Sequence, residues 1–378
     1  MGTTNEQSSG SQSSTINVAA IERELTSLWQ QASREEDSGV IRSSMLNLIV
    51  YAPAGCDVNK FDNTMIEITA AHPCRAIVMM VDRESKESQL AAQVTSRCTI
   101  PTASTKQVCC EQVTITASGE LIDEAPSAVV PLLISDLPVY LWWRAVPRVT
   151  DKTLFGRLVD IADRVIIDSA EFNDPHGDLA SMAAVLRESP RWTAFSDLNW
   201  ARLSTWRALM AGFYDVSDYR PLLDHLNSVR IEYAPPSATT STISTRALLL
   251  GGWLASRLGW RFDKASRADK SSVFEFTKDG REIAIEFAPT ERNIEPGHIA
   301  LVTFKSAADE SALFTVRRSS DATRIETAVS KGEQRRVQRV LSYESLSESE
   351  LIGKELEILG HDRVYEQAVL AAGEFIAE

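Results

Sequence analysis

The sequence contains few cysteines, and all of them lie in its first third. The five are Cys56, Cys74, Cys98, Cys109 and Cys110. Their number is odd and no Cys-x-x-Cys pair occurs, which excludes the disulfide framework of a small secreted protein. The two adjacent cysteines lie in a strand-like run, where neighbouring side chains point to opposite faces and do not converge on a zinc ion. We therefore expect reduced thiols and no bound metal.

Long apolar runs and a leader sequence are also missing. No apolar run approaches the roughly 20 residues that span a bilayer. Residues 1–15 carry one charge and no apolar stretch, so they lack the basic start and apolar core of a signal peptide. The formal net charge is -13, and such a surface repels nucleic-acid backbones and anionic lipid. We expect a cytoplasmic protein that binds neither nucleic acid nor a membrane.

Common catalytic motifs are absent as well. The sequence has no GxGxxG, no P-loop, no GxSxG and no HExxH. Only five histidines occur, and histidine is the usual general base near neutral pH. His72 lies close to Cys74 and Arg75, but neighbours along a chain rarely face one another, and a turn explains this segment more simply. We predict neither catalytic residues nor a cofactor.

The residues that are present predict an α/β domain over residues 17–233, after a polar tail at 1–16. A helical apolar pattern starts at Val18, and strand-like apolar runs then alternate with helical patterns. This alternation is typical of a mostly parallel, doubly wound sheet. The strands expected in this domain are residues 45–51, 76–81, 113–117, 139–143 and 164–168.

A segment rich in proline, serine and threonine at 234–244 reads as a linker. It is followed by a helix at 245–258 and then by short alternating strands. Asp279-Gly280 between two of these strands predicts a tight hairpin. Residues 245–378 are therefore expected to form an α+β domain with an antiparallel sheet. Its predicted strands are residues 273–277, 282–287, 299–304, 312–316 and 324–329.

Aromatic and arginine residues are the candidates for contact with a partner. Trp142 and Trp143 must point to opposite faces of their strand, so one can fill the core while the other meets a helix or another protein. Tryptophan and arginine are enriched at interface hot spots, which favours Trp143 with Arg144. Core packing is the competing explanation for the tryptophans, and a surface ion pair is the competing explanation for Arg75. The predicted partner-binding residues are Trp142, Trp143, Arg144, Arg75, Trp200 and Arg202.

Several runs resemble the OpcA family, the glucose-6-phosphate dehydrogenase assembly proteins. They include LPVYLWWR at 137–144 and DLNWARLSTWR at 197–207, together with residues 46–51, 72–76 and 163–169. The resemblance implies a non-catalytic protein that binds glucose-6-phosphate dehydrogenase, promotes its active oligomer and raises its activity. It also implies a role in the oxidative pentose phosphate pathway, which supplies NADPH, in a cyanobacterial or actinobacterial type of host.

Photosynthetic members of that family are associated with thioredoxin-linked redox control, so thioredoxin is a further expected partner. The candidate pairs are Cys56 with Cys74, or either of these with Cys98. Each pair requires Cα atoms within about 7 Å of one another.

Two alternatives stay open at this point. One is a sensor that binds a sugar phosphate without turning it over, and the other is a phosphosugar-processing α/β enzyme of unrecognised class. Both would use the carboxyl edge of the parallel sheet. The enzyme would need Arg75, Asp168 or His176 to converge in one pocket.

Overall fold

The computed structural model describes residues 11–12, 16–35, 41–42, 44–99, 108–189, 192–236, 242–268, 270–343 and 345–376. Most of the predicted tail at 1–16 and part of the predicted linker, 237–241, lie outside these residues. The chain forms two compact units, each assembled from three segments. Unit 1 comprises Met1–Asp168, Ser189–Ser196 and Ser347–His361, and unit 2 comprises Ser169–Glu188, Asp197–Leu346 and Asp362–Glu378. The predicted ranges 17–233 and 245–378 stay predictions of domain boundaries.

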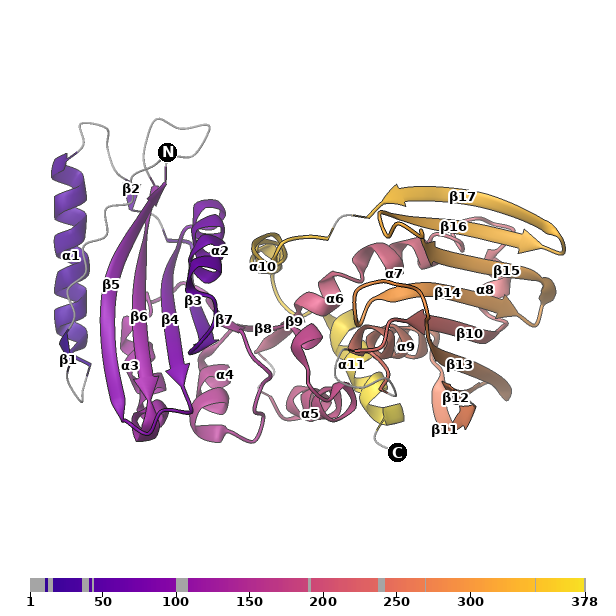
Figure 1. The fold of residues 1–378 in the computed structure, drawn as a ribbon, viewed down its shortest axis with the longest axis horizontal. Coiled ribbons are helices and arrows are strands. Elements are labelled where there is room, and N and C mark those ends of the chain that lie inside the picture. The colour runs from indigo at the N-terminus through magenta and orange to yellow at the C-terminus, as the bar shows by residue number, and fades with distance from the viewer. Residues whose placement is uncertain are drawn as a thin grey trace. The chain divides into compact units, whose positions relative to one another are not determined.

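The first sheet has the order β1-β5-β6-β4-β3-β7-β8-β9, with β2 paired to β6. Strands β6, β4, β3, β7 and β8 are parallel, and β5 runs antiparallel to β6. This arrangement confirms the mostly parallel α/β prediction (Figure 1). The bounds are β1 Ser11–Gln12, β2 Ile41–Arg42, β3 Leu46–Pro53, β4 Cys74–Asp82, β5 Gln89–Thr99, β6 Val108–Ser118, β7 Val139–Trp143, β8 Arg164–Ile167 and β9 Ala194–Asp197.

Burial on both faces explains why the central strands were visible in the sequence. β7 is buried at every residue, and β3 at all but its last, as expected of strands covered on both sides. Strand β5 was missed because polar residues interrupt its pattern. The helical bounds of unit 1 are α1 Val18–Glu35, α2 Val58–Ala71, η1 Gly119–Glu124, α3 Ala125–Val129, η2 Val130–Leu132, η3 Lys152–Gly156, α4 Arg157–Ile161 and α10 Glu348–Glu357.

The second sheet has the order β11-β12-β13-β10-β14-β15-β16-β17 and is antiparallel except for the β10–β13 pair, which confirms the predicted antiparallel sheet. The predicted hairpin joins β12 to β13, where Asp279 has φ 50 and Gly280 φ 76. The bounds are β10 Leu226–Tyr233, β11 Arg261–Ala268, β12 Ser271–Lys278, β13 Arg281–Pro289, β14 Ile299–Ser306, β15 Asp309–Arg318, β16 Arg324–Lys331 and β17 Gln334–Ser342.

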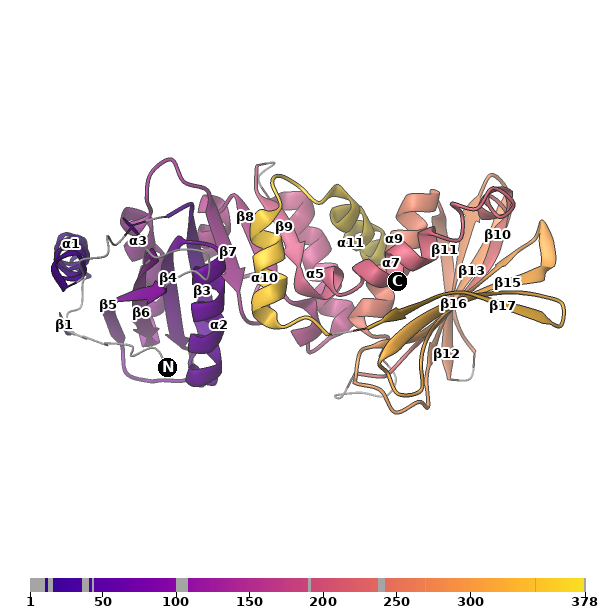
Figure 2. The same ribbon diagram turned by 90° about the horizontal axis from the view of Figure 1, so that it is seen from above.

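One face of the second sheet is covered by helices of unit 2, among them α9 and α11 (Figure 2). The alternation of buried and half-buried residues along β13 and β14 reflects this one-sided cover. Among the described residues, no helix is long and apolar enough to cross a membrane. The helical bounds of unit 2 are η4 Ser169–Glu171, α5 Pro175–Glu188, α6 Leu198–Ala201, α7 Ser204–Ala211, α8 Arg220–Leu223, α9 Thr245–Leu258 and α11 Arg363–Ile376.

Candidate functional site

The carboxyl edge of the first sheet is where an open α/β fold usually binds a ligand, at the point where the strand order reverses. In this sheet the reversal lies between β3 and β7, and aromatic side chains lie near the carboxyl ends of both strands. Tyr51 and Trp143 are paired in register and their rings stack at 3.8 Å with an interplanar angle of 3°. Phe155 meets Trp143 edge-on at 4.9 Å. All three side chains are buried, so they belong to the core of unit 1.

The turn after β3 also differs from a phosphate-binding turn. A dinucleotide-binding turn uses three glycines and leaves the following helix N-terminus open to a pyrophosphate. Here a single glycine, Gly55 with φ 87, precedes α2. The N-cap of α2 is Asp57, whose carboxylate accepts a hydrogen bond from the Lys60 amide at 3.1 Å. The helix terminus is therefore already capped by a negative charge that repels phosphate.

An ion pair holds the neighbouring loop over this edge. Arg83, just after β4, donates to Asp151 at 2.7 Å, and its Nε lies 3.4 Å from the Tyr51 hydroxyl. Burial by itself would raise the pKa of Asp151, but hydrogen bonds from the Leu154 amide and from Arg83 outweigh it and lower the pKa. The carboxylate is thus charged at neutral pH and fixes the start of η3.

Arg144, directly after β7, keeps its charge close to the surface. Its guanidinium donates to both carboxylate oxygens of Glu348 at 3.2 Å and lies 4.9 Å from the Phe61 ring and 5.1 Å from the Trp142 ring. The Arg144 side chain is 16% exposed, whereas Trp142 and Trp143 are each 1% exposed. Of these three predicted partner residues, the structure leaves only the arginine near the surface.

Arg75 lies at the opposite, amino edge of the sheet and is buried. It donates to Glu111 at 2.7 Å, to Glu22 at 2.8 Å and to the Leu132 carbonyl at 2.9 Å. Asp168 follows the carboxyl end of β8. Since β4 and β8 belong to one parallel sheet, Arg75 and Asp168 are at opposite edges. Arg75 and Asp168 therefore do not converge in one pocket, which removes this pair from the combinations of Arg75, Asp168 or His176 that the enzyme alternative named.

The three predicted cysteine pairings are also wrong, because the strand register separates the residues. Cys74 starts β4, while Cys56 follows the end of β3, so at about 3.3 Å per residue they are roughly 20 Å or more apart along the strands. Cys98 of β5 is opposite Cys109 of β6 and two strands from Cys74, about 10 Å away at roughly 4.8 Å per strand. Cys98 and Cys56 lie at opposite sheet edges. Control by thioredoxin stays a prediction that these pairs do not support.

The burial of Cys74 and Cys110 leads to a testable prediction about their reactivity. Burial, followed by the charge of Cys110, raises the pKa of Cys74, and burial also raises the pKa of Cys110. Because the thiolate is the reactive form, we expect both to react with iodoacetamide at pH 8 at least roughly tenfold more slowly than the half-buried Cys56. Mass spectrometry of alkylated peptides measures this, with denatured protein as the control. Equal rates for Cys74 and Cys56 in native protein would contradict the burial.

Trp200, predicted as a partner contact, is buried in unit 2. Its Nε1 donates to Asp362 at 3.0 Å, and the Arg207 guanidinium lies 3.5 Å from the centre of its ring. The hydrogen bond joins α6 to the residue just before α11, and the arginine contact joins α6 to α7. Half-buried Arg202 lies among positive charges near His298: burial first, then Arg246, Arg318 and Arg202 lower the pKa of His298 to about 3. The imidazole is therefore neutral, and its Nδ1 lies 2.7 Å from Arg318.

A polar cluster explains the DLNW run. The Asp197 carboxylate accepts hydrogen bonds from the Ser169 hydroxyl at 2.6 Å and from the Ser169 and Asn199 amides at 2.9 Å. The Asn199 side-chain oxygen accepts a hydrogen bond from Arg246. All four residues are buried. This network fixes the turn between β9 and α6, which accounts for these residue types without a reaction.

Strand β17, with its row of arginines and apolar residues, is a surface that the sequence interpretation missed. The signal was the run RRVQRV at 335–340, which has charges of one sign and no acidic residue. This run lacks the alternation of apolar and polar residues that identified other strands of the sheet.

Two family models match the chain and together extend over most of it. One describes the N-terminal domain of the glucose-6-phosphate dehydrogenase subunit and matches residues 65–184. The other describes the C-terminal domain of the same protein and matches residues 193–369. Both are models of OpcA domains.

Curated relatives from cyanobacteria carry the name OpcA and are described as proteins of the OxPP cycle. The Synechocystis protein is 28% identical over 319 residues, which are 80% of this chain and 63% of that protein. The Nostoc punctiforme protein is 33% identical over 227 residues, which are 59% of this chain and 46% of that protein. The chain thus spans about two thirds or less of the length of these relatives.

Solved structures with a related arrangement are distant in sequence. An NAD-binding oxidoreductase from Klebsiella pneumoniae has a TM-score of 0.43 at 10% identity, covering 87% of this chain and 94% of that one. The transcriptional regulator Gal80p from Kluyveromyces lactis has a TM-score of 0.45 at 7% identity, covering 87% of each chain. Scores this low decide nothing about function.

Proposed function

Since this chain belongs to the OpcA family of glucose-6-phosphate dehydrogenase subunits, we propose that it is an assembly factor for that enzyme. It binds the dehydrogenase oligomer, stabilises the active form and catalyses no reaction itself. The proposal places the chain in the cytoplasm and in the oxidative pentose phosphate pathway, where the activated enzyme supplies NADPH.

The match of both OpcA domains, over residues 65–184 and 193–369, is the observation that carries the proposal. The geometry of unit 1 supports it. The stack of Tyr51 on Trp143 lies where β3 and β7 end, and Asp57 caps the helix that would otherwise receive a phosphate. Packed aromatic side chains at the switch point of the sheet and a helix already capped by a carboxylate suit a protein that acts through its surface.

Activation requires that the chain bind the active oligomer more tightly than the inactive form. A tenfold shift in population needs about 1.4 kcal/mol of difference in binding free energy. A few contacts of one exposed surface supply this amount, because a single desolvated hot-spot residue contributes about 2 kcal/mol or more. Among the residues predicted from the sequence, Arg144 and Arg202 are the more accessible; the buried ones, Trp142, Trp143, Arg75 and Trp200, would act by supporting their surroundings.

The test is to mix the purified chain with its host's dehydrogenase at micromolar concentration. We expect a complex larger than the free dehydrogenase oligomer by light scattering, together with a faster rate of NADPH formation. Two further arms address the alternatives: the chain assayed alone with glucose 6-phosphate should show no turnover, and calorimetry with that sugar phosphate should show no binding. If the two proteins elute separately and the dehydrogenase kinetics stay unchanged, the proposal is wrong.

A further inference from the structure

Strand β17 is exposed along its whole length and lies at the end of the second sheet. Its neighbour β16 differs: Ile325, Thr327 and Val329 of β16 are buried under the helices of unit 2. The sheet therefore ends in an exposed strand that lies beside a largely buried one (Figure 1). A nine-residue strand in this position gains hydrogen bonds from β16 on one side and little apolar burial.

The side chains of β17 combine one sign of charge with apolar surface. The strand carries three arginines and no acidic residue, a charge of +3 in a chain whose total is -13. Val337 is 47% exposed, Val340 52% and Leu341 42%. We call these six residues the β17 surface: Arg335, Arg336, Val337, Arg339, Val340 and Leu341.

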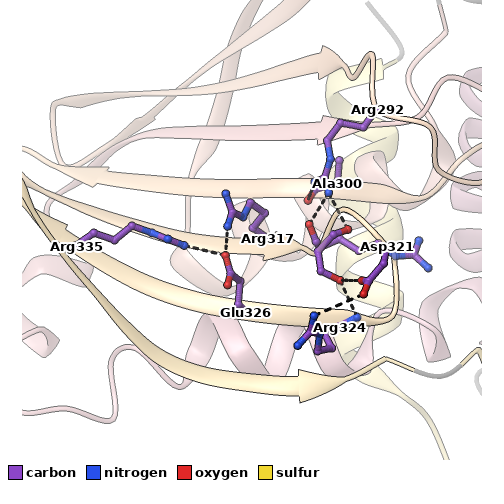
Figure 3. A network of polar contacts seen from close by, with 9 residues as sticks. Arg292, Ala300, Arg317, Asp321, Arg324, Glu326 and Arg335 are labelled. Atoms are coloured by element: carbon purple, nitrogen blue, oxygen red, sulfur yellow. Dashed lines mark hydrogen bonds and ion pairs between the residues drawn. The ribbon is translucent and has the colours of Figure 1, made fainter.

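The register distributes the β17 surface over both faces of the sheet. Val340 pairs with Glu326 and Arg335 with Ser330, on the face away from the helices. Arg336 pairs with Val329 and Leu341 with Ile325, on the helix-covered face. Arg335 is oriented by Glu326, which accepts its hydrogen bond at 2.8 Å and also binds Arg317, as Figure 3 shows. The guanidinium is thus held at the strand edge while 44% of its side chain stays exposed.

An edge strand presents a row of backbone N–H and C=O groups that can pair with another strand. Apolar side chains on such an edge favour this pairing, while charges select the partner. A second copy of this chain is disfavoured, because it would bring +3 against +3, and like charges on paired strands are destabilising. An extended segment with acidic side chains is favoured for the same reason.

We propose that β17 is a docking strand that pairs with an acidic, extended segment of a partner protein. The segment adds to the sheet as a ninth strand: its backbone bonds to the β17 edge, its carboxylates meet Arg335, Arg336 and Arg339, and its apolar side chains cover Val337, Val340 and Leu341. This inference rests on the proposed function, under which the segment belongs to glucose-6-phosphate dehydrogenase.

The opposite edge of the same sheet provides a matched control. Strand β11 is basic and exposed at Arg261 and at residues 263–267, but it includes Asp263 and carries none of the exposed large apolar side chains found among the described residues. The test variant combines Arg335→Gln, Arg336→Glu and Arg339→Glu. The control variant, at and just beyond β11, combines Lys270→Gln, Arg261→Glu and Arg267→Glu. Both change the net charge by -5, so an effect of total charge alone would be equal in the two.

Binding of each variant to the dehydrogenase is measured by calorimetry at low and at physiological salt. We expect the β17 variant to bind at least roughly tenfold more weakly, with a smaller salt dependence, while the control stays within about threefold of the wild-type chain. If the wild-type chain binds the dehydrogenase and the β17 variant binds equally well, the docking strand is wrong and the proposed function stands. If the wild-type chain does not bind at all, the proposed function itself is wrong.

A second measurement does not depend on how well the triple variant folds. A photo-crosslinking residue at Val340, in an otherwise unchanged chain, should link to an acidic segment of the dehydrogenase, whereas the same residue at Ala265 of β11 should not. A crosslink from Val340 to another copy of this chain would overturn the choice of partner, as would a dimer in sedimentation that the β17 variant loses.

Discussion

Replacing Trp143 by alanine should lower the free energy of unfolding by about 3–5 kcal/mol, the cost of emptying a large aromatic site in a packed core. Trp143 is 1% exposed, stacks on Tyr51 and receives the edge of Phe155. Neither neighbour is free to close the gap, since Tyr51 belongs to β3 and Phe155 is fixed by the turn that Asp151 caps. Urea unfolding followed by circular dichroism measures the change.

Two variants separate packing from other effects of this substitution. Trp143→Phe keeps an aromatic ring and loses no hydrogen bond, because the Trp143 Nε1 has no hydrogen-bond partner among the described residues. We expect a clearly smaller loss of stability than for alanine. Trp192→Ala removes a tryptophan that is 68% exposed and should change stability by less than about 0.5 kcal/mol. If Trp143→Ala were as mild as Trp192→Ala, the aromatic stack would not be a packed part of the core.

Gly252→Ala is expected to destabilise unit 2 by about 3 kcal/mol, the upper end of the usual cost of overpacking. A Cβ atom at Gly252 would lie 2.1 Å from the Ala368 carbonyl oxygen and 2.9 Å from the Ala372 Cβ. These atoms belong to α11, so the added methyl group would push the α9 and α11 backbones apart. The measurement is the midpoint of thermal unfolding, together with the urea dependence.

The matched control is Gly156→Ala. Gly156 has helical backbone angles, and a Cβ there would meet its nearest atom at 3.6 Å, an ordinary contact. Alanine has the higher helix propensity, so this variant should be unchanged or more stable by about 0.5–1 kcal/mol. Similar losses for both glycine variants would show that close packing of α9 on α11 is not the cause.

The two stability predictions also bear on function, because they concern buried residues that support a binding surface from below. The predicted partner residues Trp142, Trp143 and Trp200 are all buried. Their substitution would weaken binding to a dehydrogenase through loss of structure. The β17 variant, in contrast, changes exposed side chains, so it should weaken binding with a much smaller change in the unfolding midpoint.

Local sequence patterns were enough to predict the strands that are buried on both faces and the tight hairpin. The run at 139–143 coincides with β7, and Asp279-Gly280 turns between β12 and β13. Strands β5 and β17 escaped notice because each has exposed residues where an apolar pattern would be expected. Residues 125–132 form a short α-helix followed by a 3₁₀ turn, because Pro131 cannot donate the hydrogen bond that a longer helix needs.

By itself, the sequence determined the fold class and the resemblance to the OpcA family, because runs of apolar residues and long motifs are properties of neighbouring positions. Only the tertiary structure decided which distant residues meet. The register of β3 and β4 separates Cys56 from Cys74 by the length of a strand, and the parallel sheet puts Arg75 and Asp168 at opposite edges. It also leaves β17 uncovered at the end of the second sheet. Such contacts join residues that are far apart in the sequence. A local sequence pattern therefore does not predict them.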